Sequence, residues 1–352
     1  NPLTGQVWYN ATTQTLKVDT GALVGAWSTG GSLNTARGYL GGTGIQTAAL
    51  AIGNGYPGQG SEVESYNGTN WTAVNSLNTA GGGLGTGGTT TSALAFGGLT
   101  PSAPHNRTEL WNGTNWTEVN NLNTGRSYLS GCGASNTNAL AFGGNAPVAD
   151  GVVTETWNGT NWTEVNDLNT AKYISAGCGT NTAALSFGGF PGPGPGVQNA
   201  TETWNGTNWT EVNTLNTGRQ QLAGCGVNTA ALAIGGASPG AGGFRDNVES
   251  WNGTNWTEIA DLNTARANLG SSTNGTPTSA LAFGGGNPGV VAVTESWNGS
   301  AWTEIADMAT ARRRLGGAGA SNTSALAFGG SPDTAATEEF SFSGGIQTID
   351  TD

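Results

Sequence analysis

Trp111-Asn-Gly-Thr-Asn-Trp116-Thr-Glu-Val-Asn-Asn-Leu122-Asn-Thr-Gly-Arg126 is one copy of a segment that recurs along nearly the whole chain. The second tryptophan of this segment has counterparts at Trp27, Trp71, Trp162, Trp209, Trp256 and Trp302. These seven positions follow one another at steps of 44 to 47 residues. A repeat of this length is typical of four-stranded propeller blades. The sequence therefore predicts an all-β, seven-bladed β-propeller with four antiparallel strands per blade.

Each repeat divides into four short strands. The innermost (residues 129–133) is rich in glycine, which permits close approach around a crowded axis. The second (139–142) alternates Ala with Leu and Phe, and we expect it to be buried on both faces between neighbouring blades. The third (108–111) and fourth (115–119) are separated by an Asn-Gly turn, the strongest local hairpin signal.

The two ends of the chain complement each other. Residues 27–33 supply the outer half of a repeat with no third strand before it, whereas residues 338–342 form a third strand with no tryptophan after it. We expect the N-terminal segment to complete the last blade, because closure removes unpaired sheet edges. The predicted domains are a β-hairpin leader for attachment (1–20), the propeller (21–343) and a C-terminal tail (344–352).

The composition narrows the function classes. Only 10% of the 352 residues are charged and the formal net charge is −12, so nucleic acid is not an expected partner. No apolar run reaches the roughly 20 residues of a membrane helix, and no membrane insertion is expected. Cys132, Cys178 and Cys225 share a repeat position that elsewhere holds small residues. We interpret them as small buried hydrophobes and predict neither a metal site nor a cofactor.

Two charged positions recur with the repeat. A glutamate lies two residues before each aromatic residue of the third strand: Glu64, Glu109, Glu155, Glu202, Glu249, Glu295 and Glu338. A base follows most Leu-Asn-Thr strings: Arg37, Arg126, Lys172, Arg219, Arg266 and Arg312, with Gly81 as the gap. An acidic ring that binds cations is one interpretation. We expect instead partly buried, bidentate structural pairs that tie strands or blades together.

The connection between the second and third strands varies most between repeats. These loops share one topological position and should emerge on one face of the ring, which in repeat proteins is usually the binding face. The candidate binding residues in them are Tyr56, His105, Arg107, Asp150, Phe190, Phe244, Arg245, Asp246 and Asp333. Aromatic planes combined with a few directed hydrogen-bonding groups suit a glycan. Merely tolerated surface loops are the alternative.

The repeat resembles the kelch repeat over roughly residues 21–343. The shared features are a strand-ending diglycine, as in Gly97-Gly98, and the aromatic pair that follows it, as in Trp111 and Trp116. The wording Leu-Asn-Thr-Ala-Arg (33–37), followed by Thr-Ser-Ala-Leu-Ala-Phe-Gly-Gly (91–98), is similar to kelch-type propellers in virion and tail-fibre proteins of bacteriophages, especially those of aquatic cyanobacteria. Residues 5–10 of the leader are also similar to short segments of phage fibre proteins.

This resemblance implies a non-enzymatic protein of the virion, or otherwise extracellular, that serves as a fibre or surface module. Its expected partners are a host-cell glycan or protein and, through the N-terminal segment, other virion proteins; a homo-oligomer is compatible with the sequence. The alternative is a secreted or cell-surface bacterial propeller that binds carbohydrate or protein, and the third class is an enzyme. Kelch propellers include the galactose oxidases, whose copper site needs paired histidines, but this chain has only His105.

Overall fold

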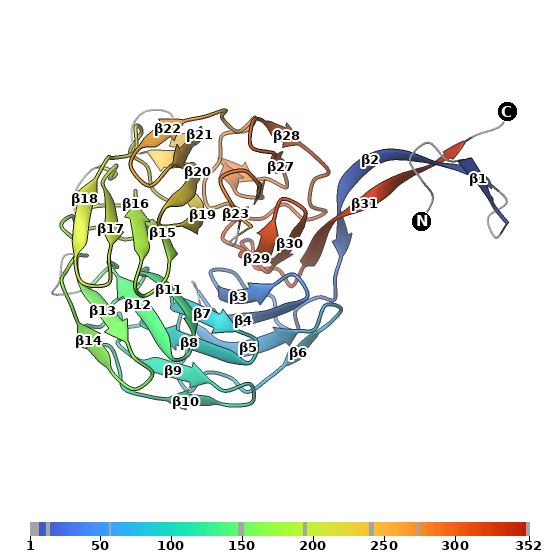
Figure 1. Cartoon of the computed structure of the whole chain (residues 1–352). Helices are drawn as coiled ribbons and strands as arrows, with labels where there is room; N and C mark the ends of the chain where they lie inside the picture. The colour runs from blue at the N-terminus through green and yellow to red at the C-terminus, as the bar shows by residue number, and fades with distance from the viewer. Residues whose placement is uncertain are drawn as a thin grey trace.

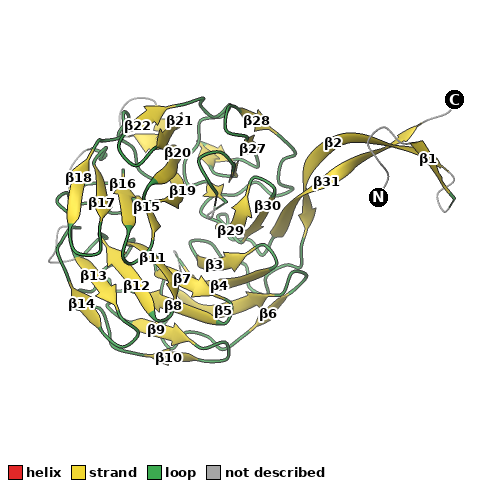
Figure 2. Ribbon diagram, in the orientation of Figure 1, coloured by secondary structure: helices red, strands yellow, loops and turns green. Residues whose placement is uncertain are grey.

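The computed structural model describes residues 7–11, 15–55, 58–146, 151–192, 196–238, 243–272 and 275–349. Seven sheets surround a central axis like the blades of a propeller, and the described part contains strands without helices (Figures 1 and 2). The fold class predicted from the repeat is therefore confirmed. In the described ranges no helix is long and apolar enough to cross a membrane.

Blades 1 to 5 each consist of four consecutive antiparallel strands, given from the axis to the rim. Blade 1 contains β3 (Gly41–Ile45), β4 (Ala48–Asn54), β5 (Gly60–Tyr66) and β6 (Trp71–Ala73). Blade 2 contains β7 (Gly85–Thr89), β8 (Ser92–Phe96), β9 (Thr108–Trp111) and β10 (Trp116–Glu118). Blade 3 contains β11 (Ser130–Ser135), β12 (Asn138–Phe142), β13 (Thr154–Trp157) and β14 (Trp162–Glu164).

The remaining blades repeat this order with local additions. Blade 4 contains β15 (Ala176–Gly179), β16 (Ala184–Phe187), β17 (Thr201–Trp204) and β18 (Trp209–Val212). Blade 5 contains β19 (Ala223–Val227), β20 (Ala230–Ser238), β21 (Gly243–Trp251) and β22 (Trp256–Glu258). Blade 6 contains β23 (Gly270–Ser271), β24 (Ala280–Phe283), β27 (Thr294–Trp297) and β28 (Trp302–Glu304), with a small hairpin of β25 (Gly286–Asn287) and β26 (Gly289–Val290).

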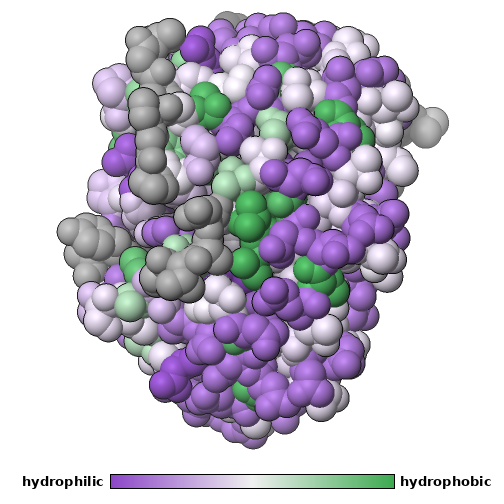
Figure 3. All heavy atoms as spheres, turned by 90° about the vertical axis from the view of Figure 1, so that its left-hand side faces the viewer, coloured by the Kyte–Doolittle hydropathy of each residue, from purple (hydrophilic) through white to green (hydrophobic). Residues whose placement is uncertain are grey.

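The alternation of side chains explains where each strand lies. In β12, Ala139 is 2% exposed and Leu140 is fully buried, so this strand packs against a neighbouring blade on each face, as predicted. In the outer strand β10, Trp116 is buried and Glu118 is exposed. The rim formed by blades 3 to 5 is accordingly mostly hydrophilic (Figure 3). Charged side chains on this rim discourage pairing with a second sheet.

Strands from both ends of the chain close the ring in blade 7. This blade contains β29 (Gly316–Ser321), β30 (Ser324–Phe328), β31 (Thr337–Ile349) and, as its outer strand, β2 (Thr15–Thr29). Trp27 pairs with Phe340, and Thr29 pairs with Glu338. Beyond the strand, the Leu33 N–H donates to the Ala335 carbonyl at 2.9 Å. The expected completion of the last blade by the N-terminal segment is thus observed.

The outer parts of β2 and β31 continue together beyond the ring as a ribbon (Figure 1). The expected leader hairpin forms, since β1 (Val7–Asn10) pairs with β2 from Val7–Val18 to Asn10–Thr15. On the other side of β2, Leu16 pairs with Ile349. Residues 344–349, which we expected to be a tail, therefore belong to a strand of this three-stranded ribbon. Leader and blade-closing strand are likewise one continuous strand.

Indole hydrogen bonds connect adjacent blades. The Nε1–H of Trp209 in blade 4 donates to the Thr154 hydroxyl of blade 3 at 2.9 Å, and Trp27, Trp71, Trp162 and Trp256 make the same contact. The Nε1 atoms of Trp116 and Trp302 are buried without a partner. At the corresponding acceptor positions the chain has Val63 and Val248, which carry no hydroxyl. The sequence difference thus explains both unpaired donors.

Replacing each valine by threonine should satisfy these donors. We expect Val63→Thr and Val248→Thr each to raise the free energy of unfolding by about 1 kcal/mol, the net worth of one hydrogen bond. The reverse change, Thr154→Val, leaves the Trp209 indole unpaired and should cost about 1 to 3 kcal/mol. Denaturant unfolding measures all three. A neutral Thr154→Val would show that these indole bonds do not stabilise the ring.

Candidate functional site

The loops between second and third strands emerge on the same face as the connections from one blade to the next. In an antiparallel blade, successive connections alternate between the two faces. The turns between first and second strands and the Asn-Gly turns between third and fourth strands therefore lie on the opposite face. We call the first side the variable face. Of the residues predicted to bind, His105, Arg107, Phe190 and Asp333 lie in loops of this face, and Phe244, Arg245 and Asp246 lie at the start of β21. Tyr56 and Asp150 lie outside the described residues.

The blade 2 loop borders a surface pocket of about 600 Å³ formed by residues 104–107 and 123–125. Nδ1 of His105 accepts the Arg107 backbone N–H at 3.2 Å, while Nε2 is buried without a partner. Burial and, secondarily, the Arg107 charge lower the pKa of His105, so the imidazole is neutral at neutral pH. Arg107 itself pairs with Glu118 on the rim at 3.1 Å. Its guanidinium therefore faces the rim strand.

The other predicted loop residues stay on their own blades. In blade 4, Phe190 contacts the Tyr173 ring edge-on, with centroids 5.1 Å apart, and the two backbones form a β-bridge. In blade 5, Phe244 and Arg245 are half-buried in β21, and Asp246 is exposed beside them. Asp333 is exposed in the blade 7 loop. The sequence did not single out Tyr173, although its aromatic type stands where other repeats have Gly, Ser, Gln, Ala or Arg.

One residue per blade, two positions before each inner strand, forms a ring at the axial mouth of the variable face. We call this set the mouth ring: Tyr39, Gly83, Tyr128, Ile174, Gln221, Asn268 and Arg314. The six non-glycine members have φ between 52° and 55°. This left-handed conformation is unusual for such side chains and costs of order 1 kcal/mol or more each, and strained residues of this kind gather at functional sites.

Members of the mouth ring hold one another. The backbone N–H of Arg314 donates to the Asn268 carbonyl at 2.9 Å, and the Tyr39 N–H donates to the Arg314 carbonyl at 3.1 Å. The Arg314 guanidinium lies 4.2 Å from the centre of the Tyr39 ring. Arg314 Nε donates to Asn268 Oδ1 at 3.4 Å, and Asn268 Nδ2 donates to Gln221 Oε1 at 3.1 Å. Tyr39, Arg314, Asn268 and Gln221 therefore form a connected polar and aromatic surface.

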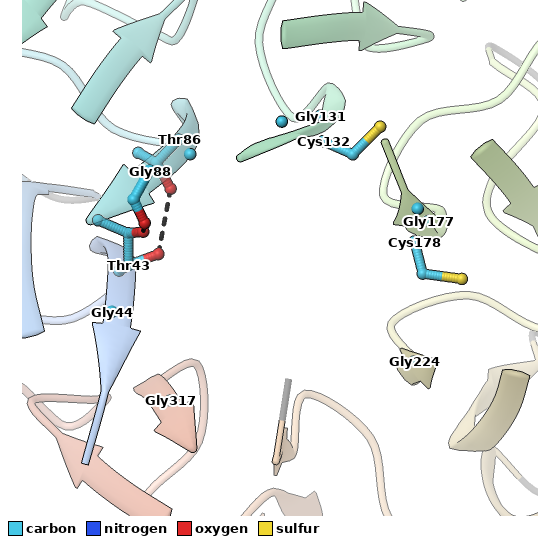
Figure 4. A pocket seen from close by; sticks show the side chains of 14 residues that line it. Thr43, Gly44, Thr86, Gly88, Gly131, Cys132, Gly177, Cys178, Gly224 and Gly317 are labelled. Atoms are coloured by element: carbon cyan, nitrogen blue, oxygen red, sulfur yellow. Dashed lines mark hydrogen bonds between the residues drawn. The ribbon is translucent and has the colours of Figure 1, made fainter. Parts of the chain in front are cut away.

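Below the mouth, the axis is a pocket of about 330 Å³ that glycines line almost throughout. The Thr43 hydroxyl donates to the Gly88 carbonyl across a blade boundary, whereas the sulfur atoms of Cys132 and Cys178 point away from the open centre (Figure 4). Burial raises the pKa of the Cys132 thiol to about 12, so it stays protonated and unreactive at neutral pH. All three cysteines are free and buried, as small-residue positions require.

The recurrent glutamates and bases meet inside the blades. Arg126 Nη1 lies 2.9 Å from Glu155 Oε1, and both side chains are at most 1% exposed. Nη2 donates to the Ala141 carbonyl, while Glu155 Oε2 accepts the backbone and side-chain N–H groups of Asn123. Equivalent ion pairs join Arg37–Glu64, Lys172–Glu202, Arg219–Glu249, Arg266–Glu295 and Arg312–Glu338. The pairs are fully rather than partly buried.

The pairing geometry differs from the bidentate one that we expected. Because the carbonyl takes Nη2, the guanidinium of Arg126 contacts a single carboxylate oxygen. The other oxygen holds the Leu-Asn-Thr connection, whose Arg126 N–H bonds to His105 of the preceding blade. Each glutamate thus connects two adjacent blades, and we interpret its role as structural.

Blade 2 shows how the missing base is replaced. Glu109 accepts from the Asn78 N–H at 2.8 Å and from the Thr79 N–H at 3.0 Å, and no described cation lies within 4 Å of it. A Cβ at Gly81 would lie 2.9 Å from His105 Nε2. The imidazole of His105 therefore occupies part of the space that an arginine or lysine at position 81 would take. His105 is thus partly a packing residue.

Solved structures of other proteins share the fold of this chain. In the described part, no group of three or more His, Cys, Asp or Glu side chains is placed to hold a metal. The structure described as that of YjhT aligns with a TM-score of 0.60 and 14% identity, over 79% of this chain and 99% of its own. A copper-bound fungal alcohol oxidase aligns at 0.61 and 14%, over 92% of this chain and 76% of its own. No family model and no curated protein matches the sequence.

Proposed function

We propose that this propeller is a non-enzymatic component of a bacteriophage virion, a fibre or surface module that attaches to a saccharide on the host cell. The kelch-like wording of the repeat supports the assignment to phage fibres. The variable face would bind the saccharide, and the ribbon of β1, β2 and β31 would join other virion proteins. Several copies per particle would raise weak binding by about 10² to 10⁴ in avidity.

The mouth ring is the observation that carries this proposal. Positions that build the blades keep one residue type or a close substitute, whereas the mouth ring contains Tyr, Gly, Ile, Gln, Asn and Arg. The side chains of Tyr39, Arg314, Asn268 and Gln221 contact one another, so they are held in place before any ligand arrives. Preorganised aromatic and amide groups suit the ring faces and hydroxyl groups of a sugar.

Replacing the loops that surround the mouth tests this proposal. Residues 101–104 and 191–196 would be replaced by Gly-Ser segments of equal length. His105, Asn106 and Gln198 stay, because their backbones hold Arg126, Leu122 and Arg219. We expect adsorption of the labelled protein to host cells to fall at least about tenfold, since lost contacts of about 1.4 kcal/mol suffice for that change.

The matched control alters the rim, not the variable face. Glu164→Gln combined with Glu211→Gln removes two exposed charges from outer strands, and adsorption should stay unchanged. If the loop variant adsorbed like the unmodified protein with its melting temperature intact, the variable face would not be the attachment surface. A structural or decorative propeller would then account better for the chain.

A further inference from the structure

Most of the basic side chains that the structure describes are paired with carboxylates. The chain has 11 lysines and arginines against a net charge of −12. Six of them form the buried pairs with glutamates, and Arg107 pairs with Glu118. Among the basic side chains that the structure describes, only Arg245, Arg313 and Arg314 have no described carboxylate within 4 Å. All three lie on the variable face.

Arg313 and Arg314 are adjacent at the axial mouth. Arg313 belongs to a β-bridge with Ser331, and its Nε is buried without a partner. Arg314 is fixed by its stack on Tyr39 and by the bond from Nε to Asn268. The two Nη atoms of Arg314 donate no hydrogen bond to any described residue. The guanidinium of Arg314 is thus held in one orientation, while its two Nη groups stay available as hydrogen-bond donors.

Such an arrangement is suited to an acid group. Paired N–H donors of arginine match the oxygens of a carboxylate or sulfate, and these charge-assisted bonds are stronger than neutral ones. Burial lowers the pKa of Arg314 from its ordinary value of 12.5, but a guanidinium remains charged at neutral pH. The net negative charge of the protein acts weakly here, because salt screens charges beyond about 8 Å at physiological ionic strength.

We propose that Arg314 anchors a subsite for the acid group of an acidic saccharide, with Asn268 and Gln221 beside it for sugar hydroxyls. This inference rests on the proposed function and names its ligand class. Tyr39 acts as a positioning residue, because the guanidinium covers its ring. A nucleic acid would need an extended basic surface, and the described part of the variable face does not offer one. The isolated pair of arginines selects one acid group at a time.

The test compares three saccharide probes of equal length by calorimetry: a hexamer of galacturonic acid, a sulfated dextran hexamer and a neutral dextran hexamer. We expect an acidic probe to bind at least about tenfold more tightly than the neutral one, and Arg314→Gln to remove that preference. Glutamine should be tolerated, since Gln221 occupies the equivalent position with φ +55°. Arg314→Lys keeps the charge without the planar fork and should lose about half of the gain in log affinity.

The matched control is Lys17→Gln, which removes one positive charge from strand β2 in the ribbon, outside the variable face, and should leave every affinity unchanged. The stronger of the two acidic probes identifies the acid group. Absence of binding by both acidic probes would overturn the acidic-saccharide inference, as would an affinity for them that Arg314→Gln does not change. Cell adsorption that still depends on the loops would in that case leave the proposed attachment function standing.

Discussion

Deletion of residues 21–34 is expected to open the ring and make the protein aggregate. The deletion removes Trp27, whose indole donates to Thr294 at 2.8 Å, and Leu33, which is 4% exposed. Loss of one half-buried tryptophan and one buried leucine costs on the order of 5 kcal/mol, a large share of the stability of a domain. The uncovered edge of β31 would also be free to pair with another chain. Thermal unfolding and light scattering measure both effects.

Deletion of residues 1–14 is the matched control. This deletion of equal length removes β1, which pairs with residues 15–18 of β2 in the ribbon, so the melting temperature of the ring should change little. If the 21–34 deletion melted like the intact protein without aggregating, the N-terminal segment would not be what closes the ring.

Arg126→Ala should destabilise the protein by on the order of 3 kcal/mol. The substitution leaves the Glu155 carboxylate, which is fully buried, without its cation, and breaking a buried pair costs about 3 to 5 kcal/mol. The remaining N–H donors from Asn123 and Thr124 moderate the loss, as the cation-free Glu109 of blade 2 illustrates. Denaturant unfolding measures the change.

Arg126→Lys is the control that the chain itself suggests. In blade 4, Lys172 Nζ lies 3.2 Å from Glu202 Oε1 and donates to the Ala200 carbonyl at 3.3 Å. The Nε atom that lysine lacks has no acceptor in Arg126, so the cost should stay near 1 kcal/mol or below. If Arg126→Ala were fully stable but lost binding to cells, the ion pairs would belong to the functional site and not to the scaffold.

The sequence predicts the scaffold well because each structural need recurs seven times. The repeat remains recognisable despite substitutions in single copies. It predicts the glycine-rich inner strands, the second strands that are buried on both faces, and Trp27 as the residue that completes the last blade. The ribbon was only partly predictable. Residues 344–349 have no counterpart in the repeat, so their pairing with Leu16 and its neighbours depends on where the ring brings both ends of the chain.

The candidate site was harder to predict for a physical reason. Of the residue types in the mouth ring, only Gly83 and Asn268 favour a positive φ, and the left-handed turn is imposed by the hydrogen bonds between neighbouring blades. Tyr39 and Arg314 meet only because the ring closes, since most of the chain separates them. The sequence signal for the mouth ring was that the residue two positions before each inner strand varies between repeats. The loops carry a stronger signal, because their lengths vary as well as their residues.

Hydrogen–deuterium exchange with and without the saccharide fraction of cells to which the protein adsorbs tests the central claim most directly. Backbone amides around the mouth, at residues 38–40, 127–129 and 312–315, and those of the neighbouring loops should exchange more slowly when the saccharide is bound, because their contacts with water and their local opening are reduced. The Asn-Gly turns of the opposite face should not change. Protection confined to those turns or to the ribbon would contradict attachment through the variable face.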